Sequence, residues 1–224
     1  ISITSAAMQF TYRDHVVNLL DTPGHRDFSE DTYRVLAAVD AVVMVLDAAK
    51  GLEPQTLKLF EVCRGRQLPV LTFLNKFDRP SRDPLELLDE IEEQIDLRPT
   101  PVTWPVGSGE DFRGVYDRLE RRLHLFERAV RGRHRAPDRV SGIHDEAFRN
   151  LMPPQVYSAW VEEVEMLAGA GEAFQADDIL AGRVTPVFFG SGITNFGVQL
   201  LLDYFVKHGA PPQPRQSTDG RHID

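Results

Sequence analysis

Short runs of apolar and β-branched residues alternate along this chain with stretches in which apolar residues recur at helical spacing. This alternation is typical of parallel strands joined by crossover helices, in a sheet covered on both faces. Strands are expected at residues 3–12, 15–20, 41–46, 69–74 and 185–189, and helices at 28–39, 54–64, 85–95 and 196–207. The pattern predicts an α/β fold, a three-layer sandwich with a mainly parallel sheet. Asp83, directly before Pro84, is expected to cap the third helix.

Two segments depart from this rhythm. Residues 100–182, approximately, hold an arginine-rich piece, RGVYDRLERRLHLFERAVRGRHR, and then an acidic helical piece, YSAWVEEVEMLAGAGEAF. We interpret this segment as a helical subdomain inserted between two strands. Residues 209–224 lack periodicity and contain few apolar residues, as linkers do. Residues 1–208 are therefore expected to form one domain, and 209–224 to lead toward a second domain that is absent from the sequence.

The charge and cysteine content limit the functions open to the chain. Lys and Arg number 25 against 34 Asp and Glu, a formal net charge of -9, so the chain as a whole is not a basic nucleic-acid binder. Any RNA contact must be local; the arginine-rich residues 113–135 are a candidate, and a solvated helix explains them equally well. The single cysteine, Cys63, excludes an intrachain disulfide and a cysteine-rich zinc site, and it fits a reduced, cytoplasmic setting.

The segment VVNLLDTPGHRDF places Asp21 at the end of an expected strand, followed by a tight turn. Ligands bind at that end of the strands in open parallel sheets. The Asp21 carboxylate suits Mg²⁺, a hard cation that takes carboxylates, waters and phosphate oxygens. Gly24 leaves room for its N–H to approach a terminal phosphate, and His25 would stand beside that phosphate. A strand-to-helix turn with an acidic cap explains the same residues, because the DxxG pattern also occurs by chance.

The segment LPVLTFLNKFD ends a second apolar strand with Asn75, Lys76 and Asp78. The Asp78 carboxylate can accept hydrogen bonds from the ring N–H and amino group of guanine, and the stem of Lys76 can lie along the base. A polar turn after a buried strand is the plainer explanation. A third strand ends in Gly190-Ser191-Gly192, whose backbone N–H groups could meet the guanine carbonyl, although glycine-rich turns are usually structural.

Taken together and in order, ISIT, DTPGH, NKFD and GSG resemble the second to fifth nucleotide-binding motifs of the translational GTPases. The resemblance covers most of the chain. The longer segments DFSEDTYR, VTWPVGSGEDFRGVYD and TPVFFGSGITNFGVQLLLD, together with MQF, are similar to the bacterial peptide chain release factor 3 family more than to elongation factor G. The resemblance implies the G domain of a P-loop GTPase, with the helical insertion of the elongation factor G-like branch.

The resemblance also implies roles for the residues around the terminal phosphate. Ser2 matches the hydroxyl that ligates Mg²⁺, and Ile1 matches one wing of an apolar gate. Asp21 matches the carboxylate that holds the metal through water. Gly24 matches the residue that senses the γ-phosphate, and His25 the catalytic residue that positions the attacking water. GTP or GDP and Mg²⁺ are the implied cofactors.

For the base, the resemblance implies that Asn75, Lys76 and Asp78 read guanine. Ser191, with Gly192 beside it, would contact the base carbonyl through the backbone. In this family, GTP binding and hydrolysis on the ribosome drive the departure of class I release factors after peptide release. The implied partners are the ribosome, with its RNA near the GTPase-activating region, and class I peptide chain release factors. We expect a monomer with no membrane partner.

The sequence departs from the family pattern in one respect. No glycine is followed by lysine, so the phosphate loop GxxxxGK[ST] is missing, together with its strand, its helix and most of switch I. That loop supplies N–H donors, a lysine and a metal-binding hydroxyl. We therefore expect this chain alone to bind GTP poorly and to be inactive as a GTPase. Two alternatives stay open: another ribosomal GTPase of the elongation factor G or ribosomal-protection type, and a nucleotide-free interaction module.

Overall fold

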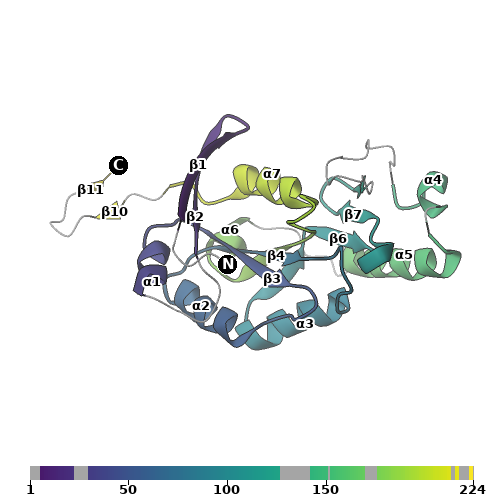
Figure 1. Ribbon diagram of the computed structural model, residues 1–224, viewed down its shortest axis with the longest axis horizontal. Helices are drawn as coiled ribbons and strands as arrows, with labels where there is room; N and C mark the ends of the chain where they lie inside the picture. The colour runs from purple at the N-terminus through teal and green to yellow at the C-terminus, as the bar shows by residue number, and fades with distance from the viewer. Residues whose placement is uncertain are drawn as a thin grey trace.

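A four-stranded parallel sheet forms the centre of the chain (Figure 1). The computed structural model describes residues 6–22, 30–126, 142–150, 152–169, 176–212, 215–216 and 222–223. The strands follow the spatial order β3 (Val42–Asp47), β4 (Val70–Asn75), β9 (Val184–Phe189) and β5 (Arg98–Pro101). Every neighbouring pair is parallel. The strands expected at 41–46, 69–74 and 185–189 are thereby confirmed to within one residue at each end.

Helices cover both faces of this sheet (Figure 1). One face carries α1 (Glu30–Leu36), α2 (Pro54–Gly65) and α3 (Pro84–Ile95), and the other carries α6 (Ala176–Leu180) and α7 (Val198–His208). Side chains of β4 alternate between the two cores: Val70 and Leu74 pack with α2 and α3, and Leu71 and Phe73 pack with α7. The predicted three-layer α/β sandwich is confirmed, because each side of the central strand is buried under helices.

Helix α3 begins where the sequence indicates. The Asp83 carboxylate accepts hydrogen bonds from the backbone N–H groups of Leu85 at 2.8 Å and Glu86 at 3.3 Å. Pro84 occupies the first turn, where a missing N–H costs little. The predicted cap is confirmed. The side of the helix that faces the sheet carries its four buried apolar residues, Leu87, Leu88, Ile91 and Ile95.

The first two strands form a hairpin outside the four-stranded sheet. β1 (Ala6–Tyr12) pairs antiparallel with β2 (His15–Asp21). The strand expected at 15–20 is confirmed. The strand expected at 3–12 is confirmed for residues 6–12, which are the part of it that the structure describes. Arg13 and Asp14 in the turn both have positive φ, as two-residue hairpin turns with the right twist require. Arg13 Nε lies 2.6 Å from the carboxylate of Asp203 in α7, and this ion pair joins the hairpin to the rest of the protein.

The inserted segment contains the expected helices, but it begins with a three-stranded antiparallel sheet that the sequence analysis missed. Its elements are β6 (Thr103–Val106), a short 3-10 helix (Gly109–Asp111), β7 (Gly114–Asp117), β8 (Arg122–Leu125), α4 (Glu146–Arg149) and α5 (Pro154–Gly169). The arginine-rich sequence carries apolar residues that suit either a helix or a strand. The strands prevail because they bury Val115 and Leu123 against the rest of the subdomain.

Two buried tryptophans hold the inserted sheet against α5. The Trp104 ring nitrogen donates to Glu163 Oε2 at 3.0 Å, and the Trp160 ring nitrogen donates to the carbonyl oxygen of Pro105 at 2.8 Å. Each large ring is thus buried with its one polar atom satisfied. The sheet and α5 therefore form one packed unit beside the central sheet.

Near the end of the chain, β10 (Arg215–Gln216) and β11 (His222–Ile223) pair antiparallel. The interpretation of residues 209–224 as a linker stays a prediction. Among the helices that the structure describes, none combines the length and the apolar character needed to cross a membrane.

Candidate functional site

Three strands of the central sheet end side by side at one edge. In the parallel register, Asp47 at the end of β3 is level with Asn75 at the end of β4, and Leu74 is level with Phe189 at the end of β9. The polar turns that follow β4 and β9 therefore meet at the carboxyl edge of the sheet. Open parallel sheets bind their ligands at this edge.

The Asn75 side chain fastens these two turns to each other. Its Oδ1 accepts hydrogen bonds from the backbone N–H groups of Lys76 and Gly192, each at 2.8 Å. The backbone N–H of Phe77 also donates to the carbonyl oxygen of Gly190 at 3.1 Å. One loop cluster thus contains the five residues predicted to bind the base, Asn75, Lys76, Asp78, Ser191 and Gly192.

The Asp78 carboxylate, which is predicted to accept hydrogen bonds from guanine, has an oxygen without a partner in the described part of the chain. Its Oδ1 is buried and has no hydrogen-bond partner among the described residues, and the same holds for Ser191 Oγ. A buried acceptor without a partner costs roughly 1–3 kcal/mol, more when it is charged. N–H donors that reached Asp78 Oδ1 would remove that cost, and a small movement of the turn would be needed to expose this oxygen.

The glycine-rich turn after β9 differs from the expectation. The N–H of Gly190 donates to the carbonyl of Leu74 at 3.0 Å and that of Ser191 to the carbonyl of Phe196 at 2.9 Å, while that of Gly192 is bound to Asn75. All three N–H groups are therefore already engaged. A backbone contact from Ser191 or Gly192 to a base carbonyl stays a prediction, and it requires one of these bonds to be exchanged.

Lys76 makes an ion pair that no sequence pattern predicts. Its Nζ lies 2.6 Å from Oδ2 of Asp47, and Asp47 Oδ1 accepts a hydrogen bond from the N–H of Ala49 at 3.0 Å. Burial works to raise the pKa of Asp47, but the hydrogen bonds from Lys76 and Ala49 outweigh it and hold the pKa below its usual value. The signal available in the sequence was that Asp47 ends the strand before the one that carries Asn75.

Phe77, the apolar residue within the NKFD turn, anchors that turn in the core. Its side chain is fully buried. The ring lies edge-on to Phe189 with centroids 5.2 Å apart and tilted against Phe112 at 6.0 Å, and Phe189 in turn lies edge-on to Trp104 at 5.4 Å. The position of Asp78 is therefore coupled to packing between the central sheet and the inserted subdomain.

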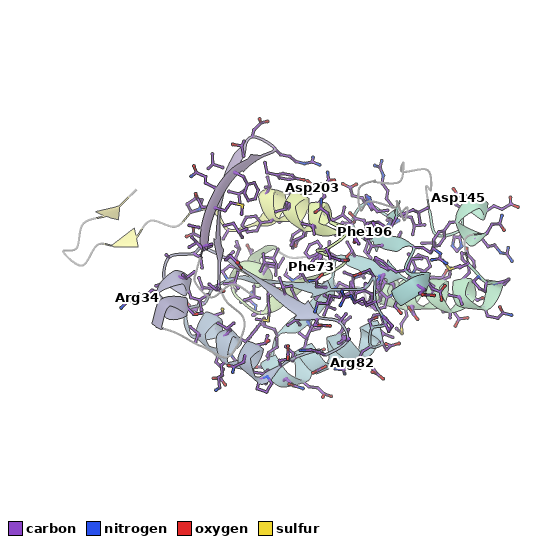
Figure 2. The ribbon with its side chains drawn as sticks, in the orientation of Figure 1. Arg34, Phe73, Arg82, Asp145, Phe196 and Asp203 are labelled. Atoms are coloured by element: carbon purple, nitrogen blue, oxygen red, sulfur yellow. The ribbon has the colours of Figure 1, made fainter. Side chains whose placement is uncertain are left out.

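Gly190 is expected to tolerate no side chain. An added Cβ would collide with the carbonyl oxygen of Phe196 and lie 2.9 Å from the ring of Phe73; Figure 2 labels both residues. We expect Gly190→Ala to lower the free energy of unfolding by roughly 1–3 kcal/mol, as overpacking does. At Gly192 an added Cβ would meet Asn75 Oδ1 at an ordinary 3.5 Å, so Gly192→Ala is the matched control. Urea unfolding measures the stability of both variants, and an equal loss of stability in Gly190→Ala and Gly192→Ala would contradict the prediction.

The residues predicted to surround the terminal phosphate are only partly described. Asp21 ends β2 and is exposed, and β2 belongs to the two-stranded sheet rather than to the sheet whose edge carries the loop cluster. Ser2, Gly24 and His25 lie outside the described residues, as does Ile1. Within the described part of the chain, no group of three His, Cys, Asp or Glu side chains is arranged to hold a metal ion.

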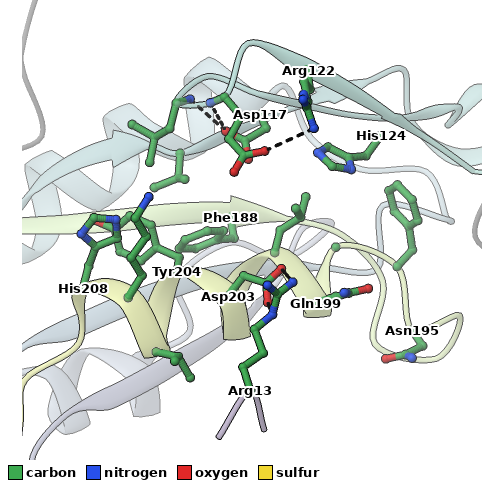
Figure 3. Close-up of a pocket in the computed structure, with 18 of the residues that line it drawn as sticks. Arg13, Asp117, Arg122, His124, Phe188, Asn195, Gln199, Asp203, Tyr204 and His208 are labelled. Atoms are coloured by element: carbon green, nitrogen blue, oxygen red, sulfur yellow. Dashed lines mark hydrogen bonds and ion pairs between the residues drawn. The ribbon is translucent and has the colours of Figure 1, made fainter. Parts of the chain in front are cut away.

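A separate cavity of about 1260 Å³ lies between α7, the hairpin turn and the strands β7 and β8 (Figure 3). Its lining is mixed in charge, with Arg13 and Asp203 paired to each other and with Arg122 and Lys207 contributing further positive charge. Among the predicted nucleotide-binding residues that the structure describes, none lines it. The cavity is therefore separate from the loop cluster, and its volume does not bear on nucleotide binding there.

Comparison with known proteins agrees with the motif order. The model of the elongation factor Tu GTP binding domain matches residues 1–211. The peptide chain release factor 3 of Gloeobacter violaceus is 55% identical over 220 residues, which are 98% of this chain and 41% of that protein. Those of Synechococcus elongatus and Synechocystis sp. are 54% and 52% identical, over 98% of this chain and 40% of each protein. The chain spans about two fifths of the length of these relatives.

Proposed function

Because the chain belongs to the elongation factor Tu GTP-binding domain family, we propose that its loop cluster reads guanine in a translation termination factor similar to peptide chain release factor 3. The observation that carries the proposal is the buried, unpartnered Oδ1 of Asp78, in a turn that Asn75 ties to the turn after β9. The proposal is supported by the 50–55% identity to proteins named peptide chain release factor 3.

In this proposal each side chain of the NKFD turn has a distinct task. Asp78 accepts hydrogen bonds from the ring N–H and amino group of guanine, which adenine lacks as a pair. The stem of Lys76 lies along the face of the base. Asn75 holds the two turns in place, so that the base meets a preformed site. Ser191 and Gly192 offer backbone N–H groups to the base carbonyl by exchange.

The proposal extends to hydrolysis of GTP on the ribosome. His25 would position the water that attacks the γ-phosphate in line, and Gly24 would sense that phosphate. Ser2 and Asp21 would hold Mg²⁺, the first directly and the second through water. When bound, the ion would neutralise charge at the phosphates, because phosphoryl transfer is promoted by positioning and electrostatics. Hydrolysis would promote the departure of class I release factors in the cytoplasm.

Isothermal titration calorimetry tests the proposal. GDP, GTP, ADP and ATP are titrated with Mg²⁺ into residues 1–224, and into a full-length protein made by joining these residues to the flanking segments of the peptide chain release factor 3 of Gloeobacter violaceus. We expect guanine nucleotides to bind the full-length protein and adenine nucleotides not to. Residues 1–224 alone should bind poorly, because they contain no GxxxxGK[ST] loop for the phosphates.

Two results would contradict this account. Tight GDP binding by residues 1–224 alone would show that the phosphate loop is not needed. Binding by neither protein would remove the guanine-reading function and leave the interaction module as the better description.

A further inference from the structure

We propose that Asp47 is a positioning residue for guanine recognition, which acts by holding the side chain of Lys76 in place. The inference rests on the proposed function, since it assigns Lys76 to the face of the base. It depends on the ion pair between Lys76 Nζ and Asp47 Oδ2, which joins the end of β3 to the turn after β4. Sequence separation hides this contact, because the two positions are 29 residues apart.

The Asp47 carboxylate is held in place independently of Lys76. The backbone after β3 folds into a tight turn, in which the N–H groups of Lys50 and Gly51 both donate to the Asp47 carbonyl at 2.9 Å. The N–H of Ala49 donates to the Asp47 carboxylate. The Asp47 side chain is only 17% exposed. Its carboxylate is thus a fixed point rather than a flexible surface group.

Hydrogen bonds connect the turn after β3 to β4 and to α3. The N–H of Ala48 donates to the carbonyl of Asn75 at 2.9 Å, and the N–H of Leu52 donates to Glu90 Oε1 in α3 at 3.1 Å. Glu90 also binds the guanidinium of Arg82. These contacts fix the position of Asp47 relative to the NKFD turn.

Lys76 is constrained at both ends of its side chain. Its backbone has a φ of 73°, which is unusual outside glycine, and its N–H is bound to Asn75. Its ammonium group is bound to Asp47, although the side chain is 45% exposed. A lysine with a free end would lose much more rotamer freedom on meeting a base. The ion pair therefore orders the apolar stem before the ligand arrives.

The neighbouring charges leave this pairing undisturbed. Lys50, the other cation near Asp47, is engaged with Glu53, with Nζ and Oε1 3.1 Å apart. The hydrogen bond that Lys76 donates also keeps the pKa of Asp47 low against the effect of burial, so the carboxylate is ionised at neutral pH. The pair of opposite charges is thus present under the conditions in which nucleotide would bind.

The test is a double-mutant cycle on GDP affinity in the full-length protein. Asp47→Asn keeps an oxygen for the N–H of Ala49 but removes the charge, and Lys76→Met keeps an apolar stem but removes the ammonium group. We expect each single variant, and the double variant, to bind GDP about three- to tenfold more weakly than the unaltered protein. The equality of the three effects is the signature of a residue that acts only through Lys76.

Urea unfolding and a control variant separate positioning from damage to the fold. Asp96→Asn breaks the exposed ion pair between Arg64 at the end of α2 and Asp96 after α3, and it should leave GDP affinity unchanged. If Asp47→Asn fails to fold, Lys76→Met, at an exposed side chain, still carries the test: unchanged GDP affinity in that variant overturns the inference. Effects of Asp47→Asn and Lys76→Met that multiply in the double variant also overturn it.

The result distinguishes this inference from the proposed function. If the unaltered full-length protein does not bind GDP, the proposed function fails and this inference fails with it. If it binds GDP and prefers guanine through Asp78, while Asp47→Asn has no effect or acts independently of Lys76, only the positioning role of Asp47 is wrong.

Discussion

Asp78→Asn is expected to weaken GDP binding by the full-length protein by about two to four powers of ten. Each hydrogen bond to a charged acceptor contributes roughly 1.5–3 kcal/mol, and the carboxylate would accept two from guanine. Asparagine offers one acceptor and adds an NH₂ group that would face the amino group of the base. The loss should appear in binding of guanine nucleotides and not in folding, because Asp78 Oδ1 makes no hydrogen bond within the described protein.

Calorimetry with GDP and with xanthosine diphosphate measures this effect. Xanthine carries a carbonyl where guanine has its amino group, so the asparagine NH₂ can donate to it, and we expect the variant to prefer xanthine. Asp89→Asn, an exposed residue of α3, is the matched control and should bind GDP normally. Unchanged GDP affinity in Asp78→Asn would show that this carboxylate does not read the base.

Phe77→Ala is expected to lower the free energy of unfolding of the full-length protein by roughly 3–5 kcal/mol. The ring is fully buried between Phe189 and Phe112, and its removal leaves a cavity where the central sheet meets the inserted subdomain. GDP affinity should fall as well, since the neighbouring Asp78 loses the anchor that fixes its position.

Urea unfolding gives the stability change, and GDP titration of the folded variant gives the binding change. Phe77→Leu retains most of the volume and should cost distinctly less on both measures. A loss of stability near 1 kcal/mol or less for Phe77→Ala would mean that the site is not packed as the aromatic contacts indicate.

The sequence was informative where local pattern and tertiary structure agree. The apolar runs that became β3, β4 and β9 are strand-length, and each is followed by polar or glycine residues, so both the strands and the NKFD and GSG turns were visible. Asp83 before Pro84 specified the start of α3, because a cap depends only on near neighbours.

The sequence was less informative where structure depends on distant partners. In the segment of β7 and β8, the arginine-rich pattern suits an amphipathic helix, and only packing of Val115 and Leu123 selects strands. The contact of Asp47 with Lys76 depends on the register between β3 and β4, which no local pattern specifies. The engaged N–H of Ser191 depends on Phe196, at the far end of its own turn.

The bond between Gly192 and Asn75 has a consequence for how a base would be chosen. A base carbonyl that captured the Gly192 N–H would replace a hydrogen bond that the protein already makes, so that contact would add little net free energy. Asp78 is in the opposite situation, since its buried Oδ1 makes no hydrogen bond within the described protein that a ligand would have to replace. The two contacts would therefore contribute differently to the binding free energy. The Gly192 contact would replace an existing hydrogen bond, whereas the Asp78 contact would add a new one and, in the proposed function, would account for the preference for guanine.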